Sequence, residues 1–270
     1  MNRKAQKNLL KTIDRKKLKY ERVFYKQIRK VLHNQTMTAI DYILFTGNTD
    51  LNVNVFFKSS DLQKVFVRLY KTVGLDFAEW QHKRLKSGNK EYRIKQDEQL
   101  ISFWEEEMLK YATQAGGRIS SITSTNAVLF KRELTKILGQ ATQEGLGVED
   151  ITRLIQKDLI KNISKQQIWQ SRRIAQTEVL SAANKGQFVS AEKAGILMIK
   201  VWMTLLDSHT RDAHITADNQ SRSMDSPFSV GGEFLQHPGD VNGSPENVIN
   251  CRCAVDYVPA EDNEGFAIGV

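Results

Sequence analysis

The hydrophobic period of this chain changes at Gly195, and that change limits the folds it can adopt. Upstream, apolar residues recur mostly three, four and seven positions apart, which is the spacing of amphipathic helices. Downstream, the apolar runs are short and rich in β-branched and aromatic residues, as in buried strands. The pattern predicts a mainly α protein, with long N-terminal helices followed by a small α+β C-terminal module with a few short strands.

Helix signals divide the first part of the chain. We expect four helices with both ends defined, over residues 4–45, 96–114, about 123–139 and 164–194. Two further helices are expected to begin at an N-cap at 59–61 and at about residue 145. Ser164 and Gln167 have the capping-box form, which predicts that the last helix starts there. A turn is expected at 86–90, and Gly116 and Gly117 are expected to stop a helix.

Strand and turn signals divide the second part. Strands are expected over 196–204 and 251–258, and a hairpin with a glycine turn over 228–235. All four prolines lie in or beside the loops of this part, where they restrict turns: Pro227, Pro238, Pro245 and Pro259.

These signals predict that the chain has two domains. The first is a helical region at 1–145 with an amphipathic arm at 1–45, and the second is a domain at 146–270 with a compact module at 196–258.

The N-terminal arm is strongly basic. Residues 1–30 hold twelve lysines and arginines against two acidic residues, whereas the whole chain has a net charge of +8. Such an arm suits nucleic acid, an acidic protein surface or anionic lipid; the alternative is a solvated helix face. Because few aromatic residues lie between the charges, we expect non-specific contact with DNA, or contact with a protein partner. The basic residues are Arg3, Lys4, Lys7, Lys11, Arg15, Lys16, Lys17, Lys19, Arg22, Lys26, Arg29 and Lys30.

Neither a membrane span nor a secretory signal is expected. No run of eighteen apolar residues occurs, and the first residues lack an apolar core. The two cysteines, Cys251 and Cys253, are separated by one residue. Their Cα atoms would lie roughly 6.6 Å apart in an extended chain, which disfavours a disulfide between them. Reduced thiols and synthesis in the cytoplasm are therefore expected.

The C-terminal module contains candidate metal ligands. His214, Cys251 and Cys253, with Asp207 or His237 as a fourth partner, are zinc ligands by type. The alternative is a buried histidine and two small apolar thiols in a turn-rich core. If the histidine and thiols are only buried core residues, the protein needs no cofactor. If they bind a structural zinc ion, the ion would compensate for the limited hydrophobic core of a small module.

A metal-dependent nuclease or hydrolase acting on DNA is the alternative function. Carboxylates and histidines that suit a divalent metal and a general base lie close together in the sequence, at Asp207, His209, Asp212, His214 and Asp218. Their spacing fits no nuclease motif, and hydrophilic loops often contain such residues. Arg252 would favour a thiolate beside it, but no general base is identified. We therefore expect no catalytic residues and no enzyme.

The C-terminal half contains a recognisable ordered set of fragments, from Arg172-Arg-Ile-Ala-Gln-Thr-Glu178 on a predicted helix to Pro238-Gly-Asp240 and Asn250-Cys-Arg-Cys253. Taken in order, they resemble the Mu F-like minor head proteins, or head morphogenesis proteins, of tailed phages, and the resemblance covers about residues 145–258. Gln176 stands where the family usually has arginine, and Asn219 where a glycine often follows the aspartate. The matching residues, to which we assign a structural role, are Arg173, Thr177, Glu178, Asn184, Gly186, Trp202, Asp207, Arg211, His214, Pro238, Gly239, Asp240, Asn250, Cys251, Arg252 and Cys253.

The resemblance implies a minor capsid protein of the procapsid and virion interior, made in the host cytoplasm and associated with the portal. It implies a role in head assembly or in DNA packaging and ejection. The implied partners are the portal protein, the major capsid or scaffold protein, and packaged double-stranded DNA. Some relatives carry a toxin or other enzyme domain after the Asn-Cys-Arg-Cys element. Only 17 residues follow Cys253 here, so no such domain is expected in this chain.

Overall fold

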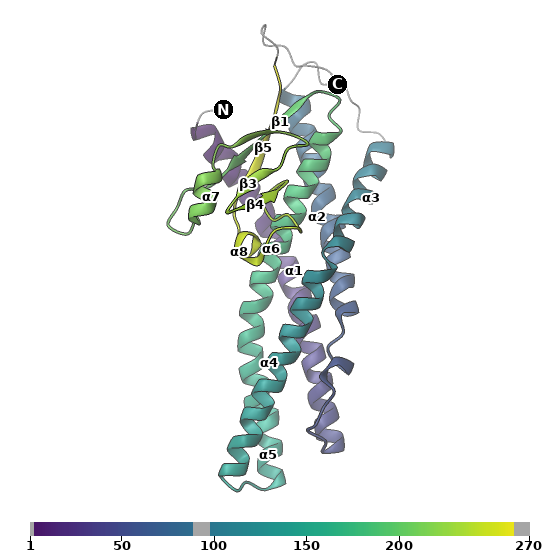
Figure 1. The fold of residues 1–270 in the computed structure, drawn as a ribbon. Coiled ribbons are helices and arrows are strands. Elements are labelled where there is room, and N and C mark those ends of the chain that lie inside the picture. The colour runs from purple at the N-terminus through teal and green to yellow at the C-terminus, as the bar shows by residue number, and fades with distance from the viewer. Residues whose placement is uncertain (1–2, 89–97, 262–270) are drawn as a thin grey trace. The chain divides into compact units, whose positions relative to one another are not determined.

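The computed structural model describes residues 3–88 and 98–261 (Figure 1). Helices α1 (Arg3–Thr46), α2 (Ser59–Gly88), α3 (Glu98–Gln114), α4 (Gly116–Gln143), α5 (Val148–Leu154) and α6 (Ile160–Glu192) come first. The remaining elements are β1 (Met198–Met203), α7 (Asp212–Ala217), β2 (Ser221–Ser223), β3 (Phe228–Val230), β4 (Glu233–Leu235), α8 (Pro245–Val248) and β5 (Ala254–Pro259). The mainly α architecture with a small C-terminal α+β module is confirmed.

The helices expected over 4–45 and 96–114 are present as α1 and α3, with small differences at their ends. Part of the turn expected at 86–90 lies outside the described residues, and α2 extends to Gly88. A short 3₁₀ helix, Val53–Val55, lies between α1 and α2.

Two predicted helix starts are wrong. Helix α4 begins at Gly116, not at 123, because the buried face at Ile119 and Thr123 extends the helical period toward the N-terminus. Helix α6 does not begin at Ser164. It continues from α5 through one turn of π-helix, Ile155–Leu159. The buried residues Ile155, Leu159 and Ile163 recur every four positions and carry one apolar stripe past the expected cap.

The chain forms two compact units that are interleaved along the sequence. One consists of Met1–Arg22, Val67–Gln114 and Gln176–Val270, and the other of Val23–Phe66 and Ala115–Ala175. Because α1, α2 and α6 are long, each contributes residues to both units. The expected domains at 1–145 and 146–270 are sequential, and that division stays a prediction.

The unit formed by residues 23–66 and 115–175 is helical. Its apolar core includes Ile40, Phe57, Phe130 and Leu159. A buried amide lies in the same unit: Gln167 Nε2 lies 3.0 Å from the Leu32 carbonyl oxygen, 2.8 Å from Thr36 Oγ1 and 3.1 Å from Asn126 Oδ1. A buried side-chain amide must keep its hydrogen bonds, and the partners of Gln167 lie on α1 and α4. Gln167, on α6, therefore fixes how these three helices pack within this unit.

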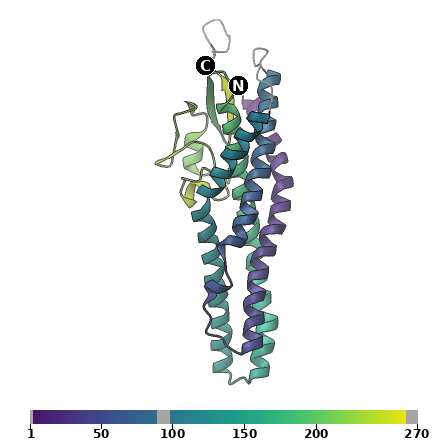
Figure 2. The ribbon, with the colours of Figure 1, turned by 90° about the vertical axis from the view of Figure 1, so that its right-hand side faces the viewer.

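The other unit combines helices with the strands. An antiparallel sheet has the order β2-β1-β5, and β3 and β4 form a separate hairpin. The hairpin turn is the expected glycine pair, with φ of 59° at Gly231 and 84° at Gly232, a backbone region that glycine tolerates. The core of the unit joins side chains of α6 to those of β1 and β5, which run beside the C-terminal part of α6 (Figure 2).

Helices α2 and α6 approach very closely in this unit. A Cβ added at Gly186 would lie 2.2 Å from the carbonyl oxygen of Gly74. Only a residue without a side chain fits there. Gly186 therefore sets the spacing of the two helices on which the C-terminal module is built.

Candidate functional site

Polar residues on α6 hold the loops of the C-terminal module. Asn184 Nδ2 donates to the Pro238 carbonyl at 3.0 Å and to the Cys253 carbonyl at 3.4 Å. The backbone N–H of Asn250 donates to Thr177 Oγ1 at 3.2 Å. Each of these contacts joins α6 to a loop far away in the sequence, so the polar positions of the helix motif serve to attach the module.

The Pro-Gly-Asp segment fits closely against α6. The Gly239 carbonyl accepts a hydrogen bond from Ser181 at 2.6 Å and one from Tyr111 at 3.3 Å. Gly239 has a φ of 78°, and a Cβ there would lie 2.9 Å from a Leu180 methyl carbon. Asp240 is buried and accepts from the backbone N–H groups of residues 236 and 242. Burial raises its pKa, but His237 and these N–H groups outweigh that effect and lower it.

Two further contacts link loops within the module. Asp207 accepts a 2.6 Å hydrogen bond from Arg252 and bonds from the backbone N–H of His209 and from Thr210. The Arg252 contact is the main reason that the pKa of Asp207 is lowered to about 2. Arg211 donates to the Ile249 carbonyl. Arg211 and Arg252 thereby connect the loop before α7 with the segment before β5.

Asp218 and Asn219 attach this module to α1. Asp218 accepts from Arg3 at 2.8 Å and from the backbone N–H of Thr204 at 2.7 Å, while Asn219 Oδ1 accepts from Gln6 at 2.7 Å. Asn219 has a φ of 63°, a left-handed conformation that asparagine tolerates better than most residues other than glycine.

His214, Cys251 and Cys253 come together in the core. His214 Nδ1 lies 3.6 Å from Cys251 Sγ and 3.3 Å from Cys253 Sγ. All three side chains are buried, both cysteines are free, and the three ligand atoms lie within 4.8 Å of one another. Trp202, also fully buried, packs edge-on against the His214 ring at 5.8 Å between centroids.

The two thiols differ in acidity. Hydrogen bonds from Cys253 and His214 hold the pKa of the Cys251 thiol well below its usual range. The same contact with Cys251, together with burial, holds the pKa of the Cys253 thiol above it. The cluster therefore favours one thiolate at Cys251, which also accepts the backbone N–H of Cys253 at 3.4 Å.

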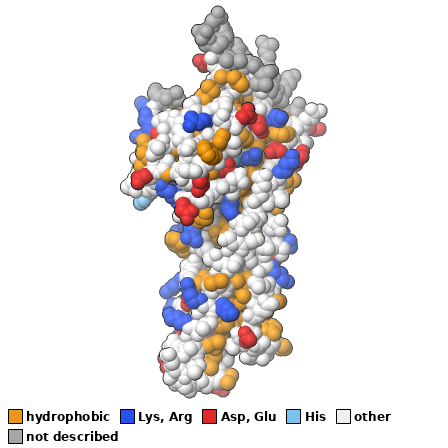
Figure 3. All heavy atoms as spheres, in the orientation of Figure 1, with side chains coloured by type: hydrophobic (Ala, Val, Ile, Leu, Met, Phe, Trp, Pro, Cys, Tyr) orange, Lys and Arg blue, Asp and Glu red, His pale blue; other side chains and the backbone are white. Residues whose placement is uncertain are grey.

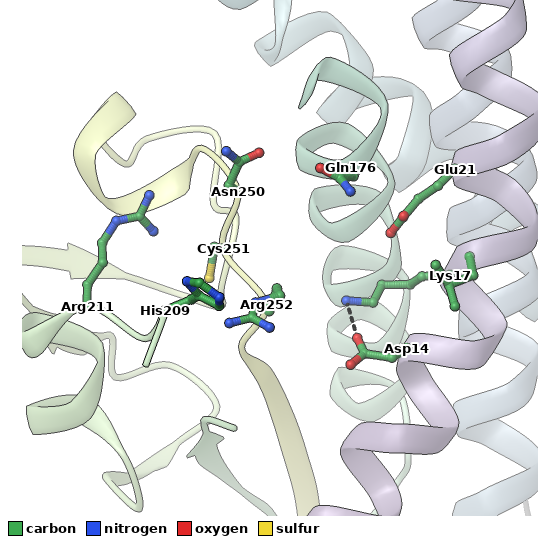
Figure 4. Close-up of a pocket in the computed structure, with 10 residues that line it drawn as sticks. Asp14, Lys17, Glu21, Gln176, His209, Arg211, Asn250, Cys251 and Arg252 are labelled. Carbon is green, nitrogen blue, oxygen red and sulfur yellow. Dashed lines mark ion pairs between the residues drawn. The ribbon is translucent and has the colours of Figure 1, made fainter. Parts of the chain in front are cut away.

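A cavity of about 580 Å³ lies beside this cluster (Figure 4). Asp14, Lys17 and Glu21 of α1 and Gln176 of α6 line one side. The loop residues His209, Arg211, Asn250, Cys251 and Arg252 face them across it. Lys17 pairs with Asp14 at 2.9 Å, and burial is the main cause that raises the pKa of Glu21. Gln176 presents a neutral amide to this cavity.

The residues considered for a nuclease do not converge. Asp207 is paired with Arg252 and Asp218 with Arg3, while His209 is exposed. Among residues 3–88 and 98–261, the group suited to a metal contains His214 and the two cysteines and no carboxylate.

Neither residue considered as a fourth zinc ligand joins the cluster. Asp207 is held by Arg252. His237 is buried elsewhere, between Tyr111 and Phe188, where burial lowers its pKa to about 4.

The basic arm is a helix whose apolar face is already covered. Its buried apolar residues include Leu10, Ile13, Phe24, Ile28 and Leu32. These side chains belong to the protein's own core and are not exposed to a partner. Four of the expected contact residues form ion pairs within the chain: Arg3 with Asp218, Lys17 with Asp14, and Lys16 and Lys19 with Asp76. The other members of the arm, from Lys4 to Lys30, are exposed.

Several buried polar residues were not singled out from the sequence. Lys200 lies on the core face of β1, 5.2 Å from the ring centres of Phe188 and Phe228, and donates to Gln236. Burial lowers its pKa to about 8. Tyr70 contacts Glu178 through its hydroxyl. Their partners lie far away in the sequence, so no local pattern identifies these residues.

Residues 132–256 match the family described as Phage Mu protein F like protein. Residues 132–256 are thus a Mu F-like segment. The minor head protein GP7 of Bacillus phage SPP1 is 30% identical over 124 residues, covering 45% of this chain and 38% of GP7. The Mu F-like segment contains the attachment contacts from Thr177 to Cys253 described above.

A second relative carries the name of an enzyme. NAD(+)--arginine ADP-ribosyltransferase EFV of Enterococcus faecalis (strain ATCC 700802 / V583) is 30% identical over 163 residues, covering 57% of this chain and 32% of that protein. This chain thus spans about a third of the length of each of these relatives. No solved structure matches it significantly. None of the described helices has the length and apolar content that a membrane span requires.

Proposed function

We propose that this protein is a non-enzymatic minor head protein that associates with the portal inside the procapsid and virion and contacts packaged double-stranded DNA without reading its sequence. Its role would lie in head assembly or in DNA packaging and ejection, after synthesis in the host cytoplasm. The Mu F-like segment and the likeness to GP7 support the minor head assignment. The arrangement of charges on α1 carries the proposed DNA contact.

Exposed cations form a stripe along α1. At 100° per residue, seven of them fall within an arc of roughly 100° of the helix. We call them the α1 stripe: Lys4, Lys7, Lys11, Arg15, Arg22, Lys26 and Arg29. Lys17 lies on the opposite, buried side of the helix and pairs with Asp14. The stripe therefore keeps its charges in solvent, while the cations that face inward are used within the fold.

Such a stripe suits a phosphate backbone. A cation that neutralises a phosphate releases counterions, and the logarithm of the binding constant falls with log salt by about 0.9 per phosphate contacted. Seven contacts would give a slope of about −6. Base recognition is not expected, because no base-stacking aromatic groups lie within the stripe.

DNA binding measured over a range of salt concentrations tests this proposal. Replacing four stripe residues by glutamine should weaken binding to duplexes of any sequence and make the slope shallower by about 3.6, using Lys4, Lys7, Lys11 and Arg15. The matched control replaces four exposed lysines of other helices, namely Lys131, Lys136, Lys157 and Lys161. Equal slopes for the two variants would refute the stripe as the DNA contact.

A separate groove supports the portal contact. Trp169 is 63% exposed and Val128 is 64% exposed, and both line a groove of about 510 Å³ between α4 and α6. Arg132, Lys165 and Arg173 surround these apolar side chains, and Arg173 lies 4.9 Å from the Trp169 ring centre. Basic and apolar side chains lie together over these helices in Figure 3. Tryptophan and arginine dominate binding energy at interfaces, so the groove suits a portal segment that carries an apolar anchor and carboxylates.

Co-expression with the portal protein tests this contact. We expect Trp169→Ala to reduce portal recovery by tenfold or more, since an interface anchor of this kind contributes about 2 kcal/mol or more. Phe234→Ala is the control, because Phe234 is another large exposed aromatic residue and lies on β4. Undiminished portal recovery with Trp169→Ala would exclude this groove.

The absence of catalysis is part of the proposal. Three of the residues considered for a nuclease are held by contacts within the chain: Asp207 by Arg252, Asp218 by Arg3 and His214 by the two thiols. We expect no transfer of ADP-ribose from NAD⁺ to arginine substrates. Transfer that depends on the amount of protein and disappears when the protein is heat-inactivated would contradict this part.

A further inference from the structure

We propose that His214, Cys251 and Cys253 bind one Zn²⁺ ion through Nδ1 and two thiolates, with water in the fourth position, and that this ion fastens α7 to the segment before β5. The site is a structural centre within the module, independent of the portal and DNA contacts proposed above.

The distances match a tetrahedral site. Zinc–sulfur bonds of about 2.3 Å and zinc–nitrogen bonds of about 2.0 Å at a tetrahedral angle place nitrogen and sulfur about 3.5 Å apart. The Nδ1 atom of His214 lies 3.6 Å and 3.3 Å from the two sulfur atoms. The distance from Nδ1 to each sulfur therefore needs to change by only a few tenths of an ångström for an ion to bind, and all three ligand atoms already lie within 4.8 Å of one another.

The choice of ligand atoms favours zinc over harder cations. One imidazole and two thiolates form a nitrogen and sulfur set, whereas calcium, magnesium and manganese prefer oxygen. Among the described residues, no carboxylate belongs to the group. The nearby Asp207 is engaged by Arg252 at 2.6 Å, so the cluster offers no carboxylate ligand to a harder ion.

The surroundings leave room for one more ligand. A cavity of about 20 Å³ adjoins the three side chains and is lined also by Leu205 and His209. A single water molecule fits a cavity of about this size. Within the described part of the chain the group has no further protein ligand, and the exposed His209 does not belong to it. Three protein ligands and one water complete four-coordination.

The position of the ligands explains what the ion would do. His214 lies in the short helix α7, and the two cysteines lie just before β5, so the ligands come from segments about forty residues apart in the chain. A six-residue helix is not stable alone. A metal bond across this gap stabilises the folded module, because the unfolded chain offers no assembled site.

Metal analysis of the full chain tests the proposal. Protein purified under reducing conditions, without a chelator or a histidine tag, should contain about one zinc per chain. Cys251→Ser combined with Cys253→Ser should reduce the zinc content at least tenfold. His209→Ala is the matched control, since this histidine lines the same cavity and is not a proposed ligand, and it should keep the metal. Zinc content equal in wild type and double variant would show adventitious binding and overturn the site.

A second measurement avoids variants that fail to fold. Zinc is removed from the wild-type protein with a chelator and Co²⁺ is added back. We expect thiolate-to-cobalt absorption that saturates at one ion per chain, the release of protons from the thiols, and a higher melting temperature. The proposal would be refuted by wild-type protein that gains no stability from added Zn²⁺ and that, as purified, contains either no zinc or a stoichiometric amount of another metal.

Discussion

Gly186→Ala tests the close packing of α6 against α2. The added methyl carbon would lie 2.2 Å from the Gly74 carbonyl oxygen and 2.9 Å from the Gly74 Cα. Both are backbone atoms of α2, so no side-chain rotation relieves the contact, and the helices must separate. Overpacking of this kind costs about 1–3 kcal/mol, and here it opposes the gain of about 1 kcal/mol that alanine normally brings within a helix. Because the overlap is with backbone atoms, we take the upper end of this range and expect a net loss of about 2 kcal/mol.

The control for this variant is Gly139→Ala. Gly139 lies within α4, and a Cβ there meets nothing within 4 Å. This substitution should stabilise the protein by roughly 0.5–1 kcal/mol through helix propensity alone. Urea unfolding followed by circular dichroism measures both variants. Two variants shifted in the same direction, or a Gly186→Ala protein as stable as wild type, would refute the close approach of α2 and α6.

Further predictions concern acid stability, attachment of the module and catalysis. The His237 pKa is about 4 in the folded protein and about 6.5 when unfolded, so between these values the unfolded chain binds more protons and stability falls as pH decreases. His237→Gln should flatten that fall, which is at most about 1.4 kcal/mol per pH unit, in unfolding experiments between pH 7 and 4.5; an unchanged slope would argue against a buried neutral histidine. Asn184→Ala should cost about 1–3 kcal/mol, because the Pro238 and Cys253 carbonyls lose their amide donor. Unfolding at the wild-type urea midpoint would contradict this role. Neither wild type nor His214→Ala should nick supercoiled DNA with Mg²⁺ or Zn²⁺, and metal-dependent nicking lost in the variant would support the nuclease instead.

The sequence alone determined which elements form. The helical period identified α1 and α3, and the change of period at Gly195 separated the helices from the strands, because both signals are local. The glycine pair at 231–232 specified the hairpin through its backbone freedom. The order of motif residues identified the Mu F-like segment, and the residue types already made His214, Cys251 and Cys253 candidates for a metal.

Only the tertiary structure decided how these elements are used. The apolar stripe continuing through Ile163 overrides the capping signal at Ser164, because burial outweighs a cap. Which cations on α1 are neutralised depends on acids such as Asp76 and Asp218, which lie far away in the sequence. Likewise, the tertiary structure places His214 in contact with the two thiols, whereas Asp207 forms an ion pair with Arg252. Spacing along the chain cannot determine such choices, since they depend on which distant side chains share one buried volume.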